Sequence, residues 1–225
     1  MGTIKLPSPF WMEEDWKTAI GFQECPYYFW KELFTKEDCE HIIRNEHKYN
    51  LKIAVTGTEQ YEMEHGEPVE DLKHLSKAER QLHYRDIRNS EVGWIPYDKA
   101  SAWIYDRMWE SAVNTNKQWN FDIRGFGEAI QYTNYDATEG EEQYYTMHRD
   151  NGIPNNHRKL SFTVQLTSSD EYEGGDFELE EAGILPYKDI GDCIMFPSFL
   201  KHRILPVTSG CRKSLVVWIS GPPLR

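Results

Sequence analysis

With 225 residues, the chain is long enough to bury a substantial core, and this length favours one domain over two small ones. Hydrophobic residues make up 39% of the sequence, including 8 Trp, 13 Tyr and 10 Phe, which excludes the aromatic-poor composition of a disordered chain. Acidic residues outnumber basic ones 37 to 25, so the average surface repels phosphate backbones and anionic lipids. We therefore expect neither nucleic acid nor membrane as a partner.

The N-terminus and the cysteines bear on the location of the protein. No run approaches the apolar length that spans a bilayer, and the first six residues lack the core of a signal peptide. The cysteines are scattered without a Cys-x-x-Cys pair, at positions Cys25, Cys39, Cys193 and Cys211. We expect a cytoplasmic protein whose cysteines are mostly buried free thiols.

The first half of the chain carries helical patterns around a charged segment. Apolar residues recur at helical spacing over residues 30–50, where Thr35 is a capping residue, and again over residues 98–113. Residues 57–87 are polar and rich in acids, with a possible short helix only at 75–82. This segment is expected to be either a solvated loop or a lid over a substrate.

From Phe126 onward, the apolar pattern changes to a period of two, which is typical of strands. Residues 160–167 alternate strictly and are followed by turn residues and by a second alternating run at 176–180, which together predict a hairpin. Further strands are predicted at residues 192–196, 203–207 and 212–219. The sequence therefore predicts an all-β sandwich or barrel with helices packed outside it.

Two histidines and one aspartate form a candidate metal site. His148 and Asp150 would point to the same face of an extended segment, and His202 follows an apolar strand across a turn containing Pro197. Two imidazoles and one carboxylate on one face of the metal are the ligand set of mononuclear Fe(II) oxygenases. Taken alone, the His148 and Asp150 pair is weak evidence, because chance pairs are common among eight histidines and a hydrogen-bonded surface histidine is the default interpretation.

A cation ten residues after His202 gives this site a possible ligand. In an extended strand, Arg212 shares a face with Ser214, Val216 and Trp218, so it would need a buried anion such as the carboxylate of a diacid. An internal salt bridge or a snorkelling side chain would also satisfy it. The polar face of residues 161–167 fits a cavity wall or a sheet face in water.

The ordered series from Tyr135 to Trp218 resembles the Fe(II)- and 2-oxoglutarate-dependent dioxygenases of the prolyl 4-hydroxylase type, especially small bacterial and phage enzymes. The match covers about residues 126–221 and extends loosely to residues 88–94. Its motifs are Tyr135, Tyr145, His148-Arg149-Asp150-Asn151, Arg158 through Leu166, Glu173-Gly174-Gly175-Asp176-Phe177, Gly191-Asp192, Phe196-Pro197, and His202 through Trp218.

The resemblance implies a mainly β domain with flanking helices, built as a double-stranded β-helix, or jelly roll. Residues 1–225 would form one domain, in which 1–125 supply helical support and a possible lid and 126–221 form the catalytic core. His148, Asp150 and His202 would bind iron, and Arg212 would pair with the distal carboxylate of 2-oxoglutarate.

The resemblance also assigns residues around the metal. The cosubstrate pocket would be lined by Tyr135, Thr163, Gln165 and Ser214, although some relatives carry Tyr where Gln165 stands. Residues that border the target prolyl group in the family match Tyr145, Arg158 and Trp218 and, on the looser N-terminal match, Trp94.

The implied activity is hydroxylation of proline in peptides or proteins, with release of succinate and CO2. Asp150 favours hydroxylation, because halogenating relatives lack this carboxylate. The expected cofactors are Fe(II), 2-oxoglutarate and O2, with ascorbate added, and the chain is expected to be a monomer. The same chemistry on a free amino acid or small molecule stays open, as does a binding module without catalysis.

Overall fold

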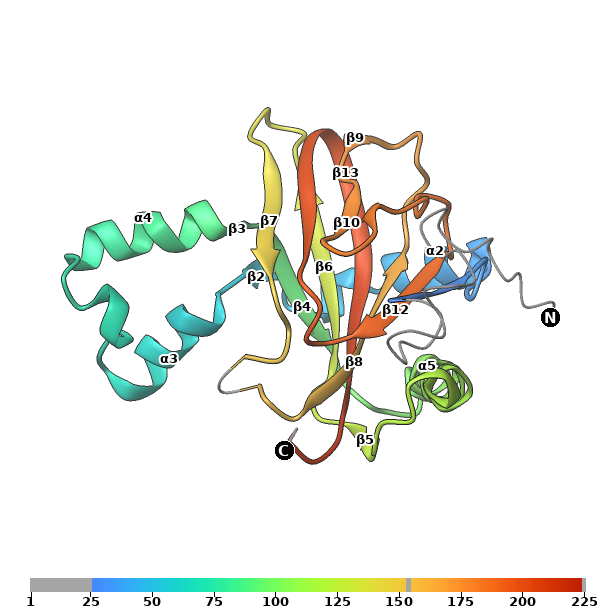
Figure 1. Cartoon of the computed structure of the whole chain (residues 1–225). Coiled ribbons are helices and arrows are strands. Elements are labelled where there is room, and N and C mark those ends of the chain that lie inside the picture. Colours follow the sequence, from blue (N-terminus) through green and yellow to red (C-terminus); the bar gives the residue numbers. More distant parts are fainter. Residues whose placement is uncertain (1–25, 153–154, 224–225) are drawn as a thin grey trace.

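The computed structural model describes residues 26–152 and 155–223, and two antiparallel sheets form its centre (Figure 1). Cys25 and the first part of the predicted N-terminal support lie outside the described residues. The larger sheet has the strand order β1-β12-β8-β13-β6-β4-β2, and β5 also pairs with β13. Its strands are β1 (Tyr28–Trp30), β2 (Lys52–Ile53), β4 (Glu91–Ile95), β5 (Gly125–Phe126), β6 (Ile130–Asp136), β8 (Arg158–Gln165), β12 (Cys193–Pro197) and β13 (His202–Ser220).

The smaller sheet faces the larger one and shares β13 with it. Around the first half of β13 lie β3 (Arg88–Asn89), β7 (Gln143–His148), β9 (Tyr172–Gly174), β10 (Phe177–Leu179) and β11 (Gly183–Ile184). The second half of β13 pairs with β6 and β8 in the larger sheet. The two sheets wound together confirm the predicted double-stranded β-helix with mainly β structure.

One long strand replaces the two predicted at residues 203–207 and 212–219. β13 passes from one sheet to the other at Gly210, which has φ +73, and a side chain there would clash with the backbone oxygen of Glu171. Glycine alone tolerates both conditions without strain. The chain can therefore change sheets without breaking the strand.

The predicted hairpin between residues 160–167 and 176–180 is wrong. β8 pairs with β12 and β13, whereas β10 pairs with β11 and β13. The two runs alternate as predicted, but they belong to different sheets. Local turn chemistry cannot distinguish a hairpin from a connection between two sheets, because the partners of both strands lie far along the chain.

Helices α2 (Lys36–Arg44) and α5 (Ala102–Thr115) cover the outer face of the larger sheet. Their apolar residues, such as Ile42 and Met108, join one core cluster with the outward side chains of β8, β12 and β13. Thr35 caps α2 in a capping box with Asp38, as predicted. The predicted helix at 98–113 is confirmed as α5, whereas the one at 30–50 begins with β1 and ends in a short 3-10 helix, η1 (Glu46–Lys48).

Residues 57–87 are two helices rather than a loop, so the loop prediction is wrong. α3 (Gly57–His65), η2 (Glu70–Leu72) and α4 (Lys77–Ile87) form an arm that extends away from the sheets (Figure 1). Glu62 on α3 accepts two hydrogen bonds from Arg80 and one from Tyr84 on α4. The helices are stabilised by N-terminal caps at Thr56 and Ser76 and by these polar contacts rather than by an apolar face. The sequence therefore shows no helical apolar period in this segment.

The described thiols fit the prediction of free cysteines. Cys39 and Cys193 are buried and Cys211 is partly buried, and none forms a disulfide. Burial raises the pKa of Cys39 to about 12 and that of Cys211 to about 11, so both stay protonated near neutral pH. Within residues 26–152 and 155–223, no helix combines the length and the apolar character needed to cross a membrane.

Candidate active site

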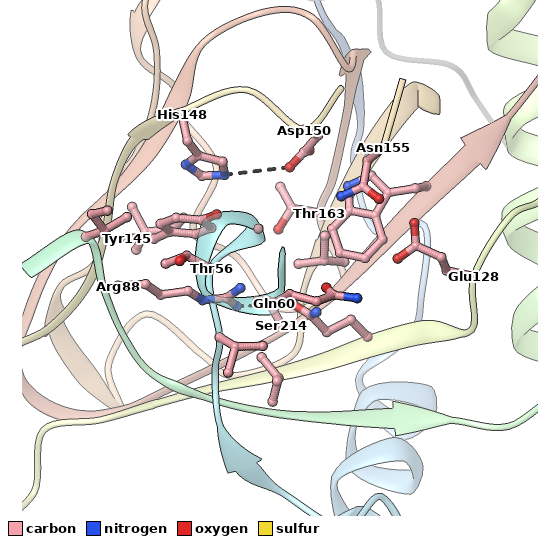
Figure 2. Close-up of a pocket in the computed structure, with 18 of the residues that line it drawn as sticks. Thr56, Gln60, Arg88, Glu128, Tyr145, His148, Asp150, Asn155, Thr163 and Ser214 are labelled. Carbon is pink, nitrogen blue, oxygen red and sulfur yellow. Dashed lines mark hydrogen bonds and ion pairs between the residues drawn. The ribbon is translucent and has the colours of Figure 1, made fainter. Parts of the chain in front are cut away.

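The predicted metal ligands meet at one end of the space between the sheets. His148 ends β7 and is the cross-strand partner of His202, the first residue of β13, while Asp150 follows in the next turn. One ligand atom of each residue lies within 4.8 Å of those of the other two. Nε2 of His148 is 3.6 Å from one oxygen of Asp150 (Figure 2), and Nε2 of His202 is 3.5 Å from the other.

Both histidines are oriented by the backbone. Nδ1 of His148 lies 2.7 Å from the carbonyl of Thr146, and Nδ1 of His202 lies 3.1 Å from that of Leu200. A carbonyl can only accept, so each Nδ1 carries the proton and each Nε2 keeps a lone pair for a metal. Burial and the neighbouring His148 lower the pKa of His202 to about 4, so its imidazole is neutral near pH 7.

Asp150 is fixed as a buried carboxylate. Ser161 on β8 donates to one of its oxygens at 2.6 Å, and its backbone N–H donates to the carbonyl of Ser198 at 3.0 Å. Burial alone would raise its pKa, but the neighbouring His202, His148 and Arg158 outweigh burial and hold that pKa below the usual range. The result is a facial set of two nitrogens and one oxygen, which suits Fe(II).

Arg212 lies deep in the same interior. The side chain is 1% exposed, and Nε, Nη1 and Nη2 have no hydrogen-bond partner within residues 26–152 and 155–223. Among the described residues, no carboxylate lies within ion-pair distance of it. Neither alternative from the sequence holds, because the side chain is neither salt-bridged nor snorkelling to solvent. A buried guanidinium in this state is costly unless an anion joins it.

The surroundings of Arg212 leave room for that anion. Gly175 has φ +64, and a side chain at this position would come within 2.8 Å of Cδ of Arg212. The guanidinium carbon is 5.6 Å from the ring centre of Tyr135 and 6.0 Å from that of Tyr187. Thr163 and Ser214, which sequence reasoning assigned to this pocket, are buried and line the cavity with Arg212.

Gln165 does not face the ligand space as expected. Its amide nitrogen donates to the carbonyl and hydroxyl of Thr167 and to the hydroxyl of Tyr172, and the residue does not line the cavity. A different hydroxyl lies near Arg212, because Tyr187 contacts Oγ1 of Thr163 at 3.1 Å. Tyr187 carries no sequence signal beyond being aromatic, and sequence reasoning missed it.

The four residues expected to border the substrate lie together above the metal ligands. The guanidinium of Arg158 is 3.7 Å from the ring centre of Trp218, which in turn is 6.4 Å from that of Trp94. Tyr145 stacks on His148 with 3.5 Å between ring centres. Glu128, which sequence reasoning missed, accepts two hydrogen bonds from Arg158 at 2.7 and 2.6 Å and so keeps its fork in place.

These residues line a cavity of about 1000 Å³ that opens beneath the helical arm. Thr56 and Gln60 of the arm and Arg88 of β3 border it together with Tyr145 (Figure 2). Sequence reasoning gave Arg88 no role, although it included residues 88–94 in the looser match, because Arg88 stands in a polar stretch close to Arg85. Arg88 is 8% exposed, donates to Ser90 and Gln131, lies over the ring of Tyr145 at 4.5 Å, and has no ion-pair partner among the described residues.

Comparison with known proteins agrees with this geometry. Residues 130–220 match the model of the 2OG-Fe(II) oxygenase superfamily. A PKHD-type hydroxylase of Synechococcus sp. (strain CC9311) is 42% identical over 131 residues, which cover 56% of this chain and 57% of that protein. A PKHD-type hydroxylase of Idiomarina loihiensis is 36% identical over 80 residues, or 34% of this chain and 37% of that protein. The chain thus spans a little more than half the length of the first of these curated relatives and about a third of the length of the second.

The fold resembles that of solved prolyl hydroxylases. A prolyl-4-hydroxylase from Pseudomonas putida superposes with a TM-score of 0.60 at 13% identity, covering 88% of this chain and 93% of that one. A Trichoplax adhaerens prolyl hydroxylase, solved with a peptide fragment of the hypoxia inducible factor oxygen degradation domain, gives 0.62 at 15% identity, covering 87% and 83%. At such identities, the likeness establishes the shared jelly-roll fold.

Proposed function

We propose that this chain is a 2-oxoglutarate-dependent dioxygenase that hydroxylates proline in peptides or proteins, and the match of residues 130–220 to the 2OG-Fe(II) oxygenase superfamily model supports this proposal. One observation carries the proposal. The His148, Asp150 and His202 cluster shares a cavity with Arg212, a buried cation that has no partner in the described residues. A metal site alone fits many chemistries, but a metal site with an unfilled carboxylate receptor fits an oxo-diacid cosubstrate.

Iron would be held by Nε2 of each histidine and by the carboxylate of Asp150. Bound there with 2-oxoglutarate and O2, it supplies the oxidant that converts a C–H bond into C–OH while 2-oxoglutarate becomes succinate and CO2. The protein residues keep the ligand set rigid. Ser161 and the carbonyls of Thr146 and Leu200 hold the carboxylate and both rings in ligating orientation before the metal arrives.

The distal carboxylate of the cosubstrate would rest on Arg212. Tyr135 and Thr163 would supply hydroxyl donors beside the guanidinium, in a space from which water is excluded by burial. A bidentate contact between a guanidinium and a carboxylate is strong and directional, so it would set the angle at which 2-oxoglutarate reaches the metal. Ser214 lines the same space.

Tyr187 would position the hydroxyl of Thr163. A threonine hydroxyl has one proton, which it cannot give to both a phenol and a carboxylate. Burial raises the pKa of Tyr187 well above its usual value, so the phenol keeps its own proton. Donation from Tyr187 to Oγ1 of Thr163 would leave the threonine proton free for the cosubstrate. This arrangement replaces the role that some relatives give to a tyrosine at the position of Gln165.

The target proline would lie against Trp218. The indole offers a flat apolar wall, Arg158 can donate to a peptide carbonyl, and Glu128 holds that guanidinium in place. Tyr145, stacked on His148, closes the side nearest the metal, and Trp94 extends the wall outward. The resemblance to prolyl hydroxylases supports proline as the substrate residue.

The arm formed by α3 and α4 would act as the lid expected from residues 57–87. Thr56 and Gln60 border the cavity, and the hydrogen bonds of Glu62 to Arg80 and Tyr84 tie the two helices into one unit. Closure of such a unit over bound substrate would exclude water from the metal site.

Hydroxylation of a free amino acid is the second candidate, and Arg88 is the observation that favours it. This buried cation has no ion pair in the described part of the chain and borders the same cavity as Arg212. A substrate carboxylate would neutralise it. Arg88→Gln should then weaken the use of free proline far more than that of a peptide capped at both ends.

The test is an incubation of the protein with Fe(II), 2-oxoglutarate and a library of proline-containing peptides, read by mass spectrometry for an added oxygen. We expect the product to appear together with succinate and to disappear when a chelator is added. Free proline serves as the parallel substrate. Neither added oxygen nor chelator-sensitive succinate in any sample would point to a binding module without catalysis.

Some expectations from the sequence stay predictions. They are ascorbate as an additional cofactor, a monomeric state, cytoplasmic location, the lack of a nucleic-acid partner, and one domain over the whole chain with a core at 126–221. Recovery of activity by ascorbate after repeated turnover, and the molar mass in solution, would test the first two directly.

A further inference from the structure

A second hollow, of about 730 Å³, lies beside the active-site cavity and is lined by four aromatic residues together with Asp106, Arg124, Glu128 and small residues. We call it the aromatic groove and define it by Tyr97, Tyr105, Trp109 and Phe126. Tyr97 is 69% exposed, which is unusual for a large aromatic side chain with ring neighbours. The groove plays no part in binding the metal or the cosubstrate as described above.

The groove adjoins the active-site cavity at Glu128, which lines both hollows, and two neighbouring stretches of chain run between them. After β4, Trp94 and Pro96 line the cavity and Tyr97 lines the groove. Before β6, Phe126 lines the groove and Glu128 lines both. β4 and β6 are paired, with Ile95 opposite Ile130, so the two stretches leave the sheet side by side. A chain bound in the cavity would reach the groove by passing Glu128.

The aromatic groove is preformed. Ring centres of Tyr97 and Tyr105 are 5.2 Å apart, those of Tyr105 and Phe126 are 4.9 Å apart, and those of Trp109 and Phe126 are 6.3 Å apart. The hydroxyl of Tyr105 donates to the carbonyl of Ile95 and accepts from the backbone N–H of Ile130 at 3.0 Å, which ties the rings to β4 and β6. A rigid apolar surface costs little ordering entropy when it binds a partner.

Its chemistry suits a polypeptide in an extended or polyproline conformation. Such chains dock on grooves lined by tyrosine and tryptophan, which accept apolar and prolyl side chains while leaving the peptide groups in water. Trp94 and Tyr97 are three positions apart, so their Cα atoms are at most about 10 Å apart, the span of about three extended residues. Only a substrate that extends past Glu128 would occupy both hollows.

We infer that the aromatic groove is a second binding site for a polypeptide substrate and receives an apolar or prolyl residue about three positions from the one that is oxidised. The inference rests on the proposed function and deepens it, because it selects a peptide over a free amino acid. The reacting residue would lie against Trp218, and the chain would continue past Trp94 and Glu128 to Tyr97. The groove would contribute affinity and sequence selection while the metal site performs the chemistry.

The experiment uses the full chain with Fe(II) and 2-oxoglutarate under anaerobic conditions, so that bound peptide does not react. The probe is a library of nine-residue peptides with a central proline, acetylated and amidated, and the peptides that stay bound are identified by mass spectrometry. We expect selection for apolar or prolyl residues about three positions to one side of the centre. Tyr97→Ala should weaken binding of the selected peptides about tenfold, as loss of an aromatic contact costs on the order of 1.4 kcal/mol.

Matched controls separate the groove from the fold and from the proposed function. Tyr97→Phe should bind the selected peptides as tightly as the unaltered chain does. A three-residue peptide should bind equally well to Tyr97→Ala and to the unaltered chain. Binding of 2-oxoglutarate is measured in the same samples, and its absence would contradict the proposed function itself. If 2-oxoglutarate binds but no peptide is retained, or Tyr97→Ala retains peptides equally, the groove inference is overturned. A dimer that Tyr97→Ala dissociates would assign the groove to a second copy of the chain and would also overturn it.

Discussion

The two faces of strands β8 and β13 differ sharply, although they share one backbone. On the outer face, Leu160, Phe162 and Leu215 are fully buried against α2 and α5 in the larger apolar cluster. On the inner face, Ser161 and Arg212 are equally buried but carry polar or charged groups aimed at the cavity. Side chains on both faces are therefore equally buried, but burial of an apolar side chain stabilises the fold, whereas burial of an unpaired charge destabilises it.

This difference separates stability from chemistry residue by residue. Apolar side chains on the outer face stabilise the fold by leaving water. Arg212 on the inner face has lost its hydration without gaining a hydrogen bond or ion pair from the described part of the chain, so it opposes folding until an anion binds. Substitutions on the two faces of one strand should thus change the free energy of unfolding in opposite directions. An apolar replacement of the buried charge should raise it, and a smaller replacement of an apolar residue should lower it.

The largest effect is expected at the metal ligands. His148→Ala removes one of the two imidazoles, so metal-dependent conversion of 2-oxoglutarate to succinate should fall to background. The unfolding midpoint of the metal-free protein should hardly change, because His148 packs at the cavity edge rather than in the outer cluster. His47→Ala, at an exposed histidine, is the control and should keep full turnover. Normal turnover by His148→Ala would refute the assigned ligand set.

Arg212→Met should produce opposite changes in function and stability. The affinity for 2-oxoglutarate, measured by calorimetry, should fall about 100-fold, since losing one partner of a buried charge pair costs roughly 2–5 kcal/mol. The free energy of unfolding without ligand should rise by about 1–4 kcal/mol, because an uncompensated buried charge is removed. Arg212→Lys keeps the charge and should retain part of the affinity. A destabilised Arg212→Met protein would mean that the guanidinium has a partner of its own.

Leu215→Ala, on the outer face, is the counterpart of Arg212→Met on the inner face. It should lower the free energy of unfolding by about 2–5 kcal/mol, because it opens a cavity in the larger cluster. Urea denaturation measures this loss, and the affinity of the folded protein for 2-oxoglutarate should stay within a factor of about two. A large loss of affinity at unchanged stability would show that the two faces are not independent.

The smallest effect is expected behind the cosubstrate pocket. Tyr187→Phe should weaken 2-oxoglutarate binding by roughly threefold to tenfold, since a net hydrogen bond contributes about 0.5–1.5 kcal/mol. In a Thr163→Val background, the same change should have no further effect on binding, because Tyr187 would act only through Thr163. Gln165→Leu should leave the affinity unchanged. If Gln165→Leu weakened 2-oxoglutarate binding and Tyr187→Phe did not, Gln165 rather than Tyr187 would support the cosubstrate pocket.

Patterns carried by neighbouring residues predicted much of the fold and the site. The alternation in β8 and β13 correctly placed Thr163, Arg212, Ser214 and Trp218 toward the interior, because strand parity depends only on the local backbone. The capping box at Thr35 and the apolar stripe of α5 are equally local. The identity of the ligand cluster followed from the types and order of its residues.

Other features depend on partners far along the chain and could not be predicted in the same way. The false hairpin paired two strands that belong to different sheets, and the arm at residues 57–87 is held by polar contacts of Glu62 rather than by an apolar period. Arg88, Glu128 and Tyr187 gain their importance only from neighbours that the fold brings to them.

By itself, the sequence determined the composition of the site: His148, Asp150 and His202 as ligands, a cation at Arg212, and a β framework that could hold them. Only the tertiary structure decided that Arg212 is buried without a hydrogen-bond or ion-pair partner in the described residues and that the cavity and the aromatic groove meet at Glu128. The physical reason is that residue type and strand parity are local properties. Desolvation and the neighbours of a charge are set by contacts between segments distant in sequence.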